Sequence, residues 1–198
     1  LGDSGKAQLY GALARRLRGA VGDAAIYLTD NGSLAWCMPF ENAADASEFA
    51  MATSSLLVSP IHPDDRPMIV RPAIGVECVS GSRPRETIQH AVLAANAAAA
   101  SGHKWKLYSQ SIADQSGHDQ HILASVDDAI ANGDIHFLFQ PKYSFKLQGF
   151  CGAEALARWR HPDLGSIPPD EFIPVLERHG RLTDLTLHSL ATIEPLLR

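Results

Sequence analysis

The sequence is most informative in two stretches, Phe139-Gln140-Pro141-Lys142 and Gly152-Ala153-Glu154-Ala155-Leu156-Ala157-Arg158-Trp159-Arg160-His161-Pro162. We expect both to be β-strands, whose side chains alternate between two faces. One face of the second strand then carries Glu154, Leu156 and Arg158. The other face carries Ala155, Ala157 and Trp159. A carboxylate and a guanidinium therefore point the same way.

The shared face of Glu154 and Arg158 has two interpretations. On a buried strand, the two groups would form an ion pair that offsets part of their desolvation. At the mouth of a barrel, the carboxylate could instead hold a hard divalent cation, and the guanidinium could bind a phosphate in bidentate fashion. Because a strand with this spacing is common, the spacing alone favours the structural ion pair.

Three motifs together resemble the opening of EAL-domain cyclic di-GMP phosphodiesterases. They are Gln-Pro-Lys at 140–142, Glu-Ala-Leu-x-Arg-Trp-x-His-Pro at 154–162 and Pro-Pro-x-Glu-Phe-Ile-Pro at 168–174. The match extends over residues 137 to about 182. Agreement of this length is specific, so the resemblance outweighs the interpretation drawn from spacing alone.

The resemblance implies a role for four residues. Glu154 corresponds to the family's first metal-ligand glutamate, and Arg158 to the arginine that grips a phosphate of the dinucleotide. Gln140 corresponds to the glutamine at the pocket floor, and Leu156 would pack beside the bound nucleotide. Enzymes of this family use Mg²⁺ or Mn²⁺ to hydrolyse cyclic di-GMP, a bacterial second messenger, to linear pGpG. Their fold is a variant of the TIM barrel.

A complete barrel of this kind needs about 250 residues, and only residues 134–198 are available for it here. We therefore expect the first strands and helices of an EAL domain, from a longer polypeptide, since the sequence begins at Leu1 without methionine. The family's later metal ligands and its catalytic lysine have no counterpart. No complete catalytic site is expected, and the fragment alone should be inactive. Trp159 should pack between strand and helices.

The N-terminal part alternates helices and strands. Apolar residues spaced four apart predict a helix over 8–21, and Asn31-Gly32 between two short apolar runs predicts a hairpin with strands 26–28 and 34–38. The elements expected next are a helix 43–58, a loop with Pro60, Pro63 and Pro67, a strand 69–79, a helix 84–101 and a strand 105–108. The pattern predicts an α/β (α+β) fold in which helices cover a sheet.

This order of elements resembles a GGDEF domain without its first strand. Where the Gly-Gly-Asp-Glu-Phe signature would stand, the hairpin reads Asp30-Asn31-Gly32-Ser33-Leu34. Diguanylate cyclases need the glycines so that GTP can approach, and the acidic pair for metal binding and catalysis. Asp30 and Asn31 are better explained as turn formers. We therefore expect a degenerate GGDEF-like domain that lacks cyclase activity and regulates or dimerises, with GTP as a candidate ligand.

A polar segment separates the two parts. Residues 109–119 are rich in Ser, Gln, Asp and Gly, which predicts a linker, and the apolar face of 121–131 predicts a helix after it. The expected domains are 1–110 (degenerate GGDEF-like domain), 111–133 (linker and connecting helix) and 134–198 (truncated EAL domain). The elements expected in the last are strands 135–140 and 150–159 and helices at about 170–179 and 182–197.

Composition narrows the function classes. The 17 basic and 22 acidic residues give a formal net charge of −5, so there is no basic excess for a general DNA, RNA or anionic-membrane binder. No apolar run reaches the length of a membrane span. The widely spaced Cys37, Cys78 and Cys151 favour neither a disulfide framework nor a zinc site, and they suit a cytoplasmic protein.

The histidines give only weak evidence for a metal site. His118 and His121 have a spacing that could bind zinc, but no third ligand lies nearby in sequence, so a solvated helix end is the preferred interpretation. His161, which precedes Pro162, is expected in a loop.

Two functions follow for the intact protein. The first is a metal-dependent cyclic di-GMP phosphodiesterase whose degenerate GGDEF-like domain regulates it or forms a homodimer. The second is a non-catalytic cyclic di-GMP receptor or scaffold that couples nucleotide binding to a partner protein. Retention of Glu154 favours the first, because a pure receptor has no need of the metal carboxylate.

Overall fold

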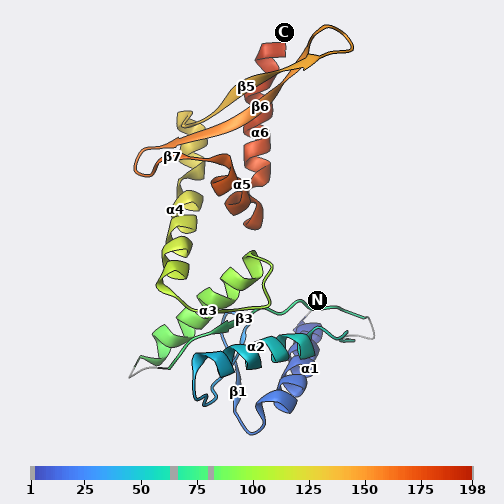
Figure 1. Cartoon of the computed structure of the whole chain (residues 1–198), viewed down its shortest axis with the longest axis vertical. Helices are drawn as coiled ribbons and strands as arrows, with labels where there is room; N and C mark the ends of the chain where they lie inside the picture. The colour runs from blue at the N-terminus through green and yellow to red at the C-terminus, as the bar shows by residue number, and fades with distance from the viewer. Residues whose placement is uncertain (1–2, 63–66, 80–82, 198) are drawn as a thin grey trace. The chain divides into compact units, whose positions relative to one another are not determined.

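The computed structural model describes residues 3–62, 67–79 and 83–197. The chain forms two compact units, Leu1–Asp114 and Gln115–Arg198. Figure 1 shows the order of their elements along the chain. We describe each unit by itself.

The first unit has the predicted order of helices and strands. Its elements are α1 (Asp3–Val21), β1 (Ile26–Leu28), β2 (Leu34–Trp36), α2 (Ala43–Leu57), β3 (Ile74–Val76), α3 (Pro84–Ala100) and β4 (Trp105–Leu107). The strand expected over 69–79 is shorter than predicted, and Pro72, which has no N–H for a ladder, precedes it. Residues 63–66 of the predicted proline-rich loop, Pro63 among them, lie outside the described residues.

Local signals explain where the helices of this unit begin and end. The side chain of Asn42 caps α2 by accepting hydrogen bonds from the backbone N–H groups of Ala44 (2.8 Å) and Asp45 (3.0 Å). Helix α3 begins at Pro84, which needs no N–H there. It ends before Gly102, whose φ of 68° lies in the left-handed region that glycine adopts readily.

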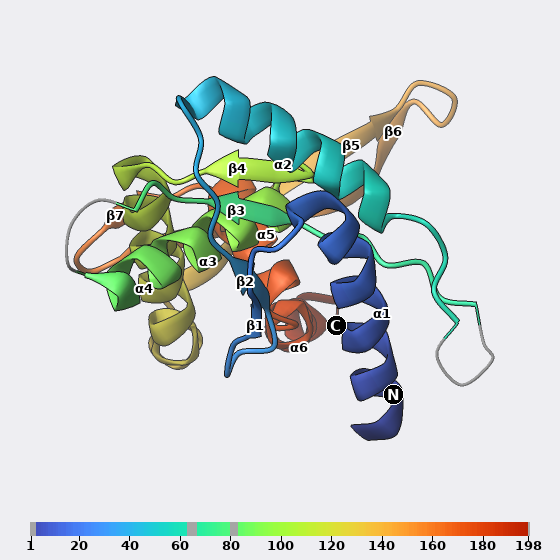
Figure 2. The same ribbon diagram turned by 90° about the horizontal axis from the view of Figure 1, so that it is seen from below.

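The strands of the first unit form two small sheets. β1 and β2 are antiparallel, whereas β3 and β4 are parallel. Figure 2 shows β3 and β4 between α2 and α3, and both helices contact both strands. A Cβ built on Gly75 would lie 1.8 Å from the backbone oxygen of Ala91, so only glycine allows α3 to approach β3 this closely. The predicted arrangement of helices covering a sheet is therefore confirmed.

Helix α4 (Gln110–Asn132) corrects the predicted linker. Residues 109–119 were expected to be irregular, yet the helix begins at Gln110. Side-chain hydrogen bonds one turn apart, from Gln110 to Asp114 (3.0 Å) and from Gln115 to Asp119 (2.9 Å), stabilise this polar stretch as helix. His118 and His121 therefore lie within a helix and not at its solvated end.

The second unit has a three-stranded antiparallel sheet in the order β5-β6-β7. Its elements after α4 are β5 (Ile135–Ser144), β6 (Gly149–His161), β7 (Gly165–Ile167), α5 (Pro169–Arg178), α6 (Leu182–Ile193) and the short 3-10 helix η2 (Glu194–Leu197). The two predicted strands are longer than expected, and β7 was not predicted.

One face of this sheet packs against helices. Trp159 is 1% exposed, and its ring makes an edge contact with Phe172 of α5, with ring centroids 5.4 Å apart. The buried cluster around them comprises Ile122, Val126, Ala129, Ile135, Ala157, Ile167, Val175, Leu176 and Leu185. The prediction that Trp159 packs between strand and helices is confirmed. The opposite face of the strands is left for other contacts.

Ion pairs tie α4 to the helices that follow the sheet. Nε2 of His118 is hydrogen-bonded to Glu171 of α5, and Arg178 of α5 forms an ion pair with Asp119 at 2.6 Å. Arg181, just before α6, bonds to both Asp184 and Asp127. Hydrogen bonds to these carboxylates raise the pKa of the Arg181 guanidinium above its usual range, so it stays charged.

Candidate functional site

The candidate site is the open face of the β5–β6 ladder. The register places Gln140 opposite Glu154, Leu138 opposite Leu156, and His136 opposite Arg158. Residues directly opposite one another in an antiparallel pair project from the same face of the sheet. All four predicted site residues, Gln140, Glu154, Leu156 and Arg158, are therefore brought together on one face.

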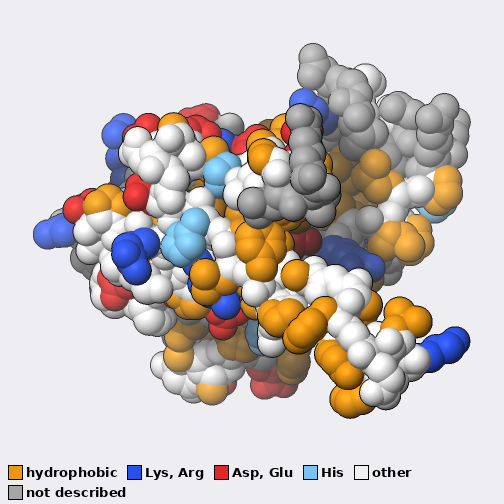
Figure 3. All heavy atoms as spheres, turned by 90° about the horizontal axis from the view of Figure 1, so that it is seen from above, with side chains coloured by type: hydrophobic (Ala, Val, Ile, Leu, Met, Phe, Trp, Pro, Cys, Tyr) orange, Lys and Arg blue, Asp and Glu red, His pale blue; other side chains and the backbone are white. Residues whose placement is uncertain are grey.

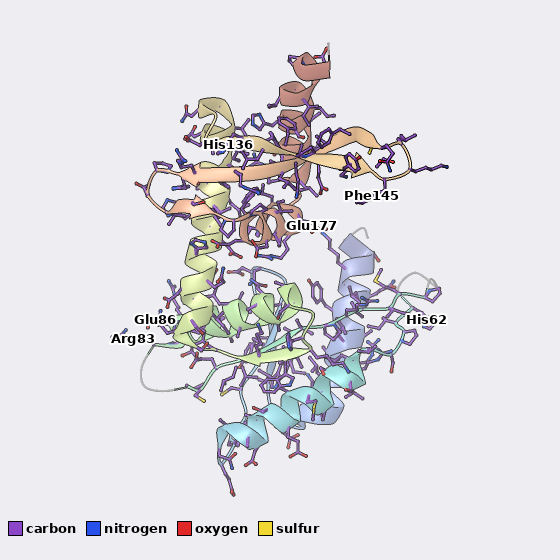
Figure 4. All side chains as sticks on the ribbon, turned by 45° about the horizontal axis from the view of Figure 1, so that its top comes forward. His62, Arg83, Glu86, His136, Phe145 and Glu177 are labelled. Atoms are coloured by element: carbon purple, nitrogen blue, oxygen red, sulfur yellow. The ribbon has the colours of Figure 1, made fainter. Side chains whose placement is uncertain are left out.

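This face is accessible. Gln140 and Glu154 are exposed, and Leu156 and Arg158 are partly buried. Buried Ala157 and Trp159 alternate with them along β6 and point to the core. Figure 4 labels His136, which the register adds to the same face and which the sequence analysis did not select. Its position opposite Arg158 could have been found only from the strand register.

Among the described residues, Glu154 and Arg158 do not form the ion pair that their spacing alone favoured, so that interpretation is wrong. Positions four apart on a strand are separated by about 13 Å along the chain. Nη1 of Arg158 instead donates a hydrogen bond to the backbone oxygen of Ala157 at 2.7 Å. Nζ of Lys142 lies 3.3 Å from Oε2 of Glu154, and their side chains are 58% and 54% exposed. Lys142 could not be predicted as the partner of Glu154 from the sequence, because the contact crosses from β5 to β6.

The side chains on this face supply only some of the ligands that a magnesium or manganese ion needs. Glu154 offers exposed carboxylate oxygens, which hard divalent cations prefer, and the Gln140 amide lies opposite it. Among the described residues, Glu154 does not belong to any group of three histidine, cysteine, aspartate or glutamate side chains close enough to hold a cation together. One carboxylate supplies one ligand, so a complete site would need donors from outside these residues.

A second cluster, of His121, His161 and Asp163, has the composition of a metal site. His161 is 3% exposed at the end of β6, so the predicted loop position is wrong. Its Nδ1 accepts hydrogen bonds from the backbone N–H groups of Asp163 and Leu164, each 3.1 Å long. Nε2 then carries the proton and donates to Oγ of Ser125 at 2.9 Å. Neither nitrogen of His161 has a lone pair left for a cation, so the cluster organises the turn before β7.

The turn between β1 and β2 carries residues suited to a turn and not to a metal. Gly32 has a φ of 77°, and its N–H donates to the backbone oxygen of Thr29 at 2.9 Å. The side-chain oxygen of Asn31 accepts from the N–H of Ser33 at 3.3 Å, as predicted for a turn former. The hydroxyl of Tyr10 donates to the Gly32 oxygen at 2.7 Å and lies over the turn.

Two further observations bear on the class of protein. Cys37, Cys78 and Cys151 are free thiols and all three are exposed, although each lies in an apolar stretch of sequence. Over the described part of the chain, no helix has the length and hydropathy needed to cross a membrane.

Comparisons with known proteins place β5 and β6 within a segment that matches a known family. Residues 123–198 match the EAL domain family model. The oxygen sensor protein DosP of Escherichia coli is 25% identical over 73% of this chain, and the cyclic di-GMP phosphodiesterase RocR of Pseudomonas aeruginosa is 40% identical over 32% of it. The chain spans only 18% and 16% of the length of these two relatives.

A solved structure of Vibrio cholerae LapD, containing S helix, GGDEF and EAL segments with cyclic di-GMP bound, shows the same fold. The aligned region covers 94% of this chain and 44% of the LapD chain, with a TM-score of 0.50 and 15% sequence identity. The predicted fold class, a GGDEF-like domain followed by the first part of an EAL domain, is thereby confirmed. Within this chain, the similarity to the EAL domain family is confined to the C-terminal part, residues 123–198.

Proposed function

We propose that this chain is part of a signalling protein that hydrolyses cyclic di-GMP to pGpG with the help of Mg²⁺ or Mn²⁺. The observation that carries the proposal is that the four EAL-motif residues lie together on one accessible face of β5 and β6, within a segment that matches the EAL family. Because its relatives are several times longer, the activity is assigned to a longer polypeptide and not to these 198 residues alone.

In this proposal, each residue on the face has a defined task. Glu154 contributes one carboxylate to the metal ions, which, when bound, activate water and neutralise developing charge. Arg158 binds a phosphate of the dinucleotide, and its partly buried side chain is held by the hydrogen bond to Ala157. Leu156 packs beside the nucleotide, and Gln140 forms the pocket floor opposite Glu154.

The ion pair with Lys142 is compatible with metal binding by Glu154. Exposed ion pairs contribute at most about 1 kcal/mol to stability, because water screens the charges and the side chains lose freedom. Lys142 can therefore release the carboxylate at little cost.

The first unit is proposed to regulate the phosphodiesterase or to form a homodimer, with GTP as a candidate ligand and without cyclase activity. The expected lack of cyclase activity is supported by the β1–β2 turn, where Gly32 and Ser33 stand in place of the acidic pair. We place the protein in the cytoplasm, where three exposed free thiols are maintained most readily.

The test uses the intact longer protein, incubated with cyclic di-GMP and Mn²⁺ and followed by chromatography of the nucleotides. We expect pGpG to accumulate, and Glu154→Ala to abolish its formation. The matched control is Glu177→Ala, which removes an exposed acid of α5 that is not part of the face (Figure 4).

Each alternative result has a clear meaning. Binding of cyclic di-GMP without turnover by the unmodified protein would assign it as a receptor. Full activity of Glu154→Ala would remove the assigned metal role. The 198-residue chain alone should produce no pGpG, and incubation of the intact protein with GTP should produce no cyclic di-GMP.

A further inference from the structure

The loop end of the β5–β6 hairpin, residues 141–152, exposes an unusual amount of apolar surface. We call this segment the hairpin tip. Its exposed apolar side chains are Tyr143 (46% exposed), Phe145 (83%), Leu147 (72%) and Phe150 (76%). Figure 4 shows Phe145 at the end of the hairpin. Single exposed apolar residues are normal on a protein surface, but a continuous apolar cluster usually marks a binding surface.

The aromatic rings of the hairpin tip form one cluster. The centroid of the Tyr143 ring lies 5.4 Å from that of Phe145 and 5.6 Å from that of Phe150, both in edge-to-face geometry. None of the three rings is buried, and the other ring contacts found in the described residues do not involve them. The cluster is therefore held in place by itself and offers its outer surface to a partner.

The charge of the hairpin tip is opposite in sign to that of the chain. Residues 141–152 contain Lys142 and Lys146 and no acidic residue, whereas the chain has a net charge of −5. Lys142 is paired with Glu154, just beyond the tip. Figure 3 shows hydrophobic side chains together with a basic one on the projecting arm formed by the hairpin. The surface thus combines aromatic rings with positive charge.

The polar groups of the turn are largely satisfied within the hairpin tip. The backbone N–H of Leu147 donates to Oγ of Ser144 at 3.2 Å, and Nε2 of Gln148 donates to the backbone oxygen of Phe145 at 2.8 Å. The ladder continues to the turn, with Ser144 opposite Gly149. Because a polar group without a partner is costly to remove from water, these bonds lower the cost of placing the tip in an apolar environment.

We propose that the hairpin tip docks on the surface of an anionic lipid bilayer. The rings of Tyr143, Phe145 and Phe150 would enter the boundary between headgroups and acyl chains, where aromatic side chains are favoured. The ammonium of Lys146 would meet the lipid phosphates. A convex tip with internally bonded polar groups suits a deformable lipid surface better than the packed pocket of a protein partner.

This proposal is independent of the hydrolase function and agrees with the net charge. A chain with a net negative charge has no general attraction for anionic membranes. We therefore expect binding only through the hairpin tip, where the local charge is positive. Contact would be peripheral, through one hairpin, and needs no membrane-spanning helix.

The test is co-sedimentation of the 198-residue chain with vesicles of phosphatidylglycerol and phosphatidylcholine, and with vesicles of phosphatidylcholine alone. We expect the bound fraction on anionic vesicles to fall about tenfold in Phe145→Ser/Phe150→Ser, because the inserted apolar area supplies the affinity. Lys146→Glu and high salt should also lower it. The control is Leu187→Ser/Leu190→Ser, which removes two side chains of α6 that are each 60% exposed, and its binding should be unchanged.

A second measurement does not depend on these variants. Cys151 is an exposed thiol within the hairpin tip, so it can carry an environment-sensitive fluorophore after Cys37→Ser and Cys78→Ser. We expect its emission to shift to the blue when anionic vesicles are added. Equal sedimentation of the wild type and Phe145→Ser/Phe150→Ser, or no spectral shift, would overturn the proposal. A dimer in vesicle-free solution that these substitutions dissociate would overturn it too, by assigning the surface to a second copy.

Discussion

Nζ of Lys142 lies 3.3 Å from Oε2 of Glu154, so the carboxylate proposed to bind metal already has a cationic neighbour on the adjacent strand. Register explains the contact: Lys142 is opposite Gly152, one pleat repeat before Glu154 on the same face. Because Gly152 has no side chain, the side chain of Lys142 can extend over it to the carboxylate of Glu154.

Replacing Lys142 should hardly affect stability. Both side chains are more than half exposed, so we expect Lys142→Met to change the free energy of unfolding by less than about 0.5 kcal/mol in urea titrations. Lys146→Met, in the same hairpin, is the control. If Lys142→Met alone lowered the free energy of unfolding by more than about 1 kcal/mol, the ion pair would contribute substantially to the stability of the fold.

Gly75 should tolerate no side chain. A Cβ there would lie 1.8 Å from the Ala91 oxygen and 2.5 Å from the Ala95 nitrogen, both backbone atoms of α3. We expect Gly75→Ala to lower the free energy of unfolding by about 2 kcal/mol or more, because the helix must move away from β3. Gly19→Ala is the control: nothing lies within 4 Å, and α1 should gain about 0.5–1 kcal/mol. Equal effects of the two substitutions would contradict the close approach of α3.

Trp159 should dominate the core of the second unit. Its side chain is 1% exposed, so Trp159→Ala should cost about 3–5 kcal/mol in thermal or urea unfolding. Trp159→Phe should cost clearly less, because it keeps a ring against Phe172 and removes a buried Nε1–H that has no hydrogen-bond partner. Similar losses for both variants would mean that the indole N–H does contribute a bond.

His161 should stabilise the turn before β7 without binding zinc. His161→Leu leaves the N–H groups of Asp163 and Leu164 without their acceptor, so we expect a loss of about 1–3 kcal/mol in the free energy of unfolding. His121→Leu, at an exposed position, should change it little. Added Zn²⁺ should not raise the melting temperature in a background without cysteines. A zinc-dependent increase that His121→Leu removes would establish a metal site there.

Local sequence signals predicted much of the fold. Asn31-Gly32 predicted the position of the first hairpin, and Pro84 and Gly102 predicted the ends of α3. The alternation of side chains along β6 predicted that Trp159 and Glu154 lie on opposite faces of the strand. The polar stretch that begins α4 was mistaken for a linker because Ser, Gln and Asp also suit a solvated helix when their side chains bond one turn apart.

Site features that depend on neighbouring strands could not be predicted. The pairing of Lys142 with Glu154 requires the β5–β6 register, and the burial of His161 requires Ser125 of α4, which is distant in sequence. Local composition carries no signal for either contact. The grouping of Gln140 with Glu154 was implied by family resemblance, and the register provides its physical basis.

The alternation along β6 also determines how the chain would respond to random substitution. Changes at positions 155, 157, 159 and 161 fall on the side that packs inward, whereas changes at 154, 156 and 158 fall on the accessible side. In the intact longer protein, a saturation mutagenesis experiment scored separately for abundance and for the proposed nucleotide turnover would thus give two interleaved profiles with a period of two. If the proposed site is correct, neighbouring codons in this strand are expected to tolerate different kinds of substitution.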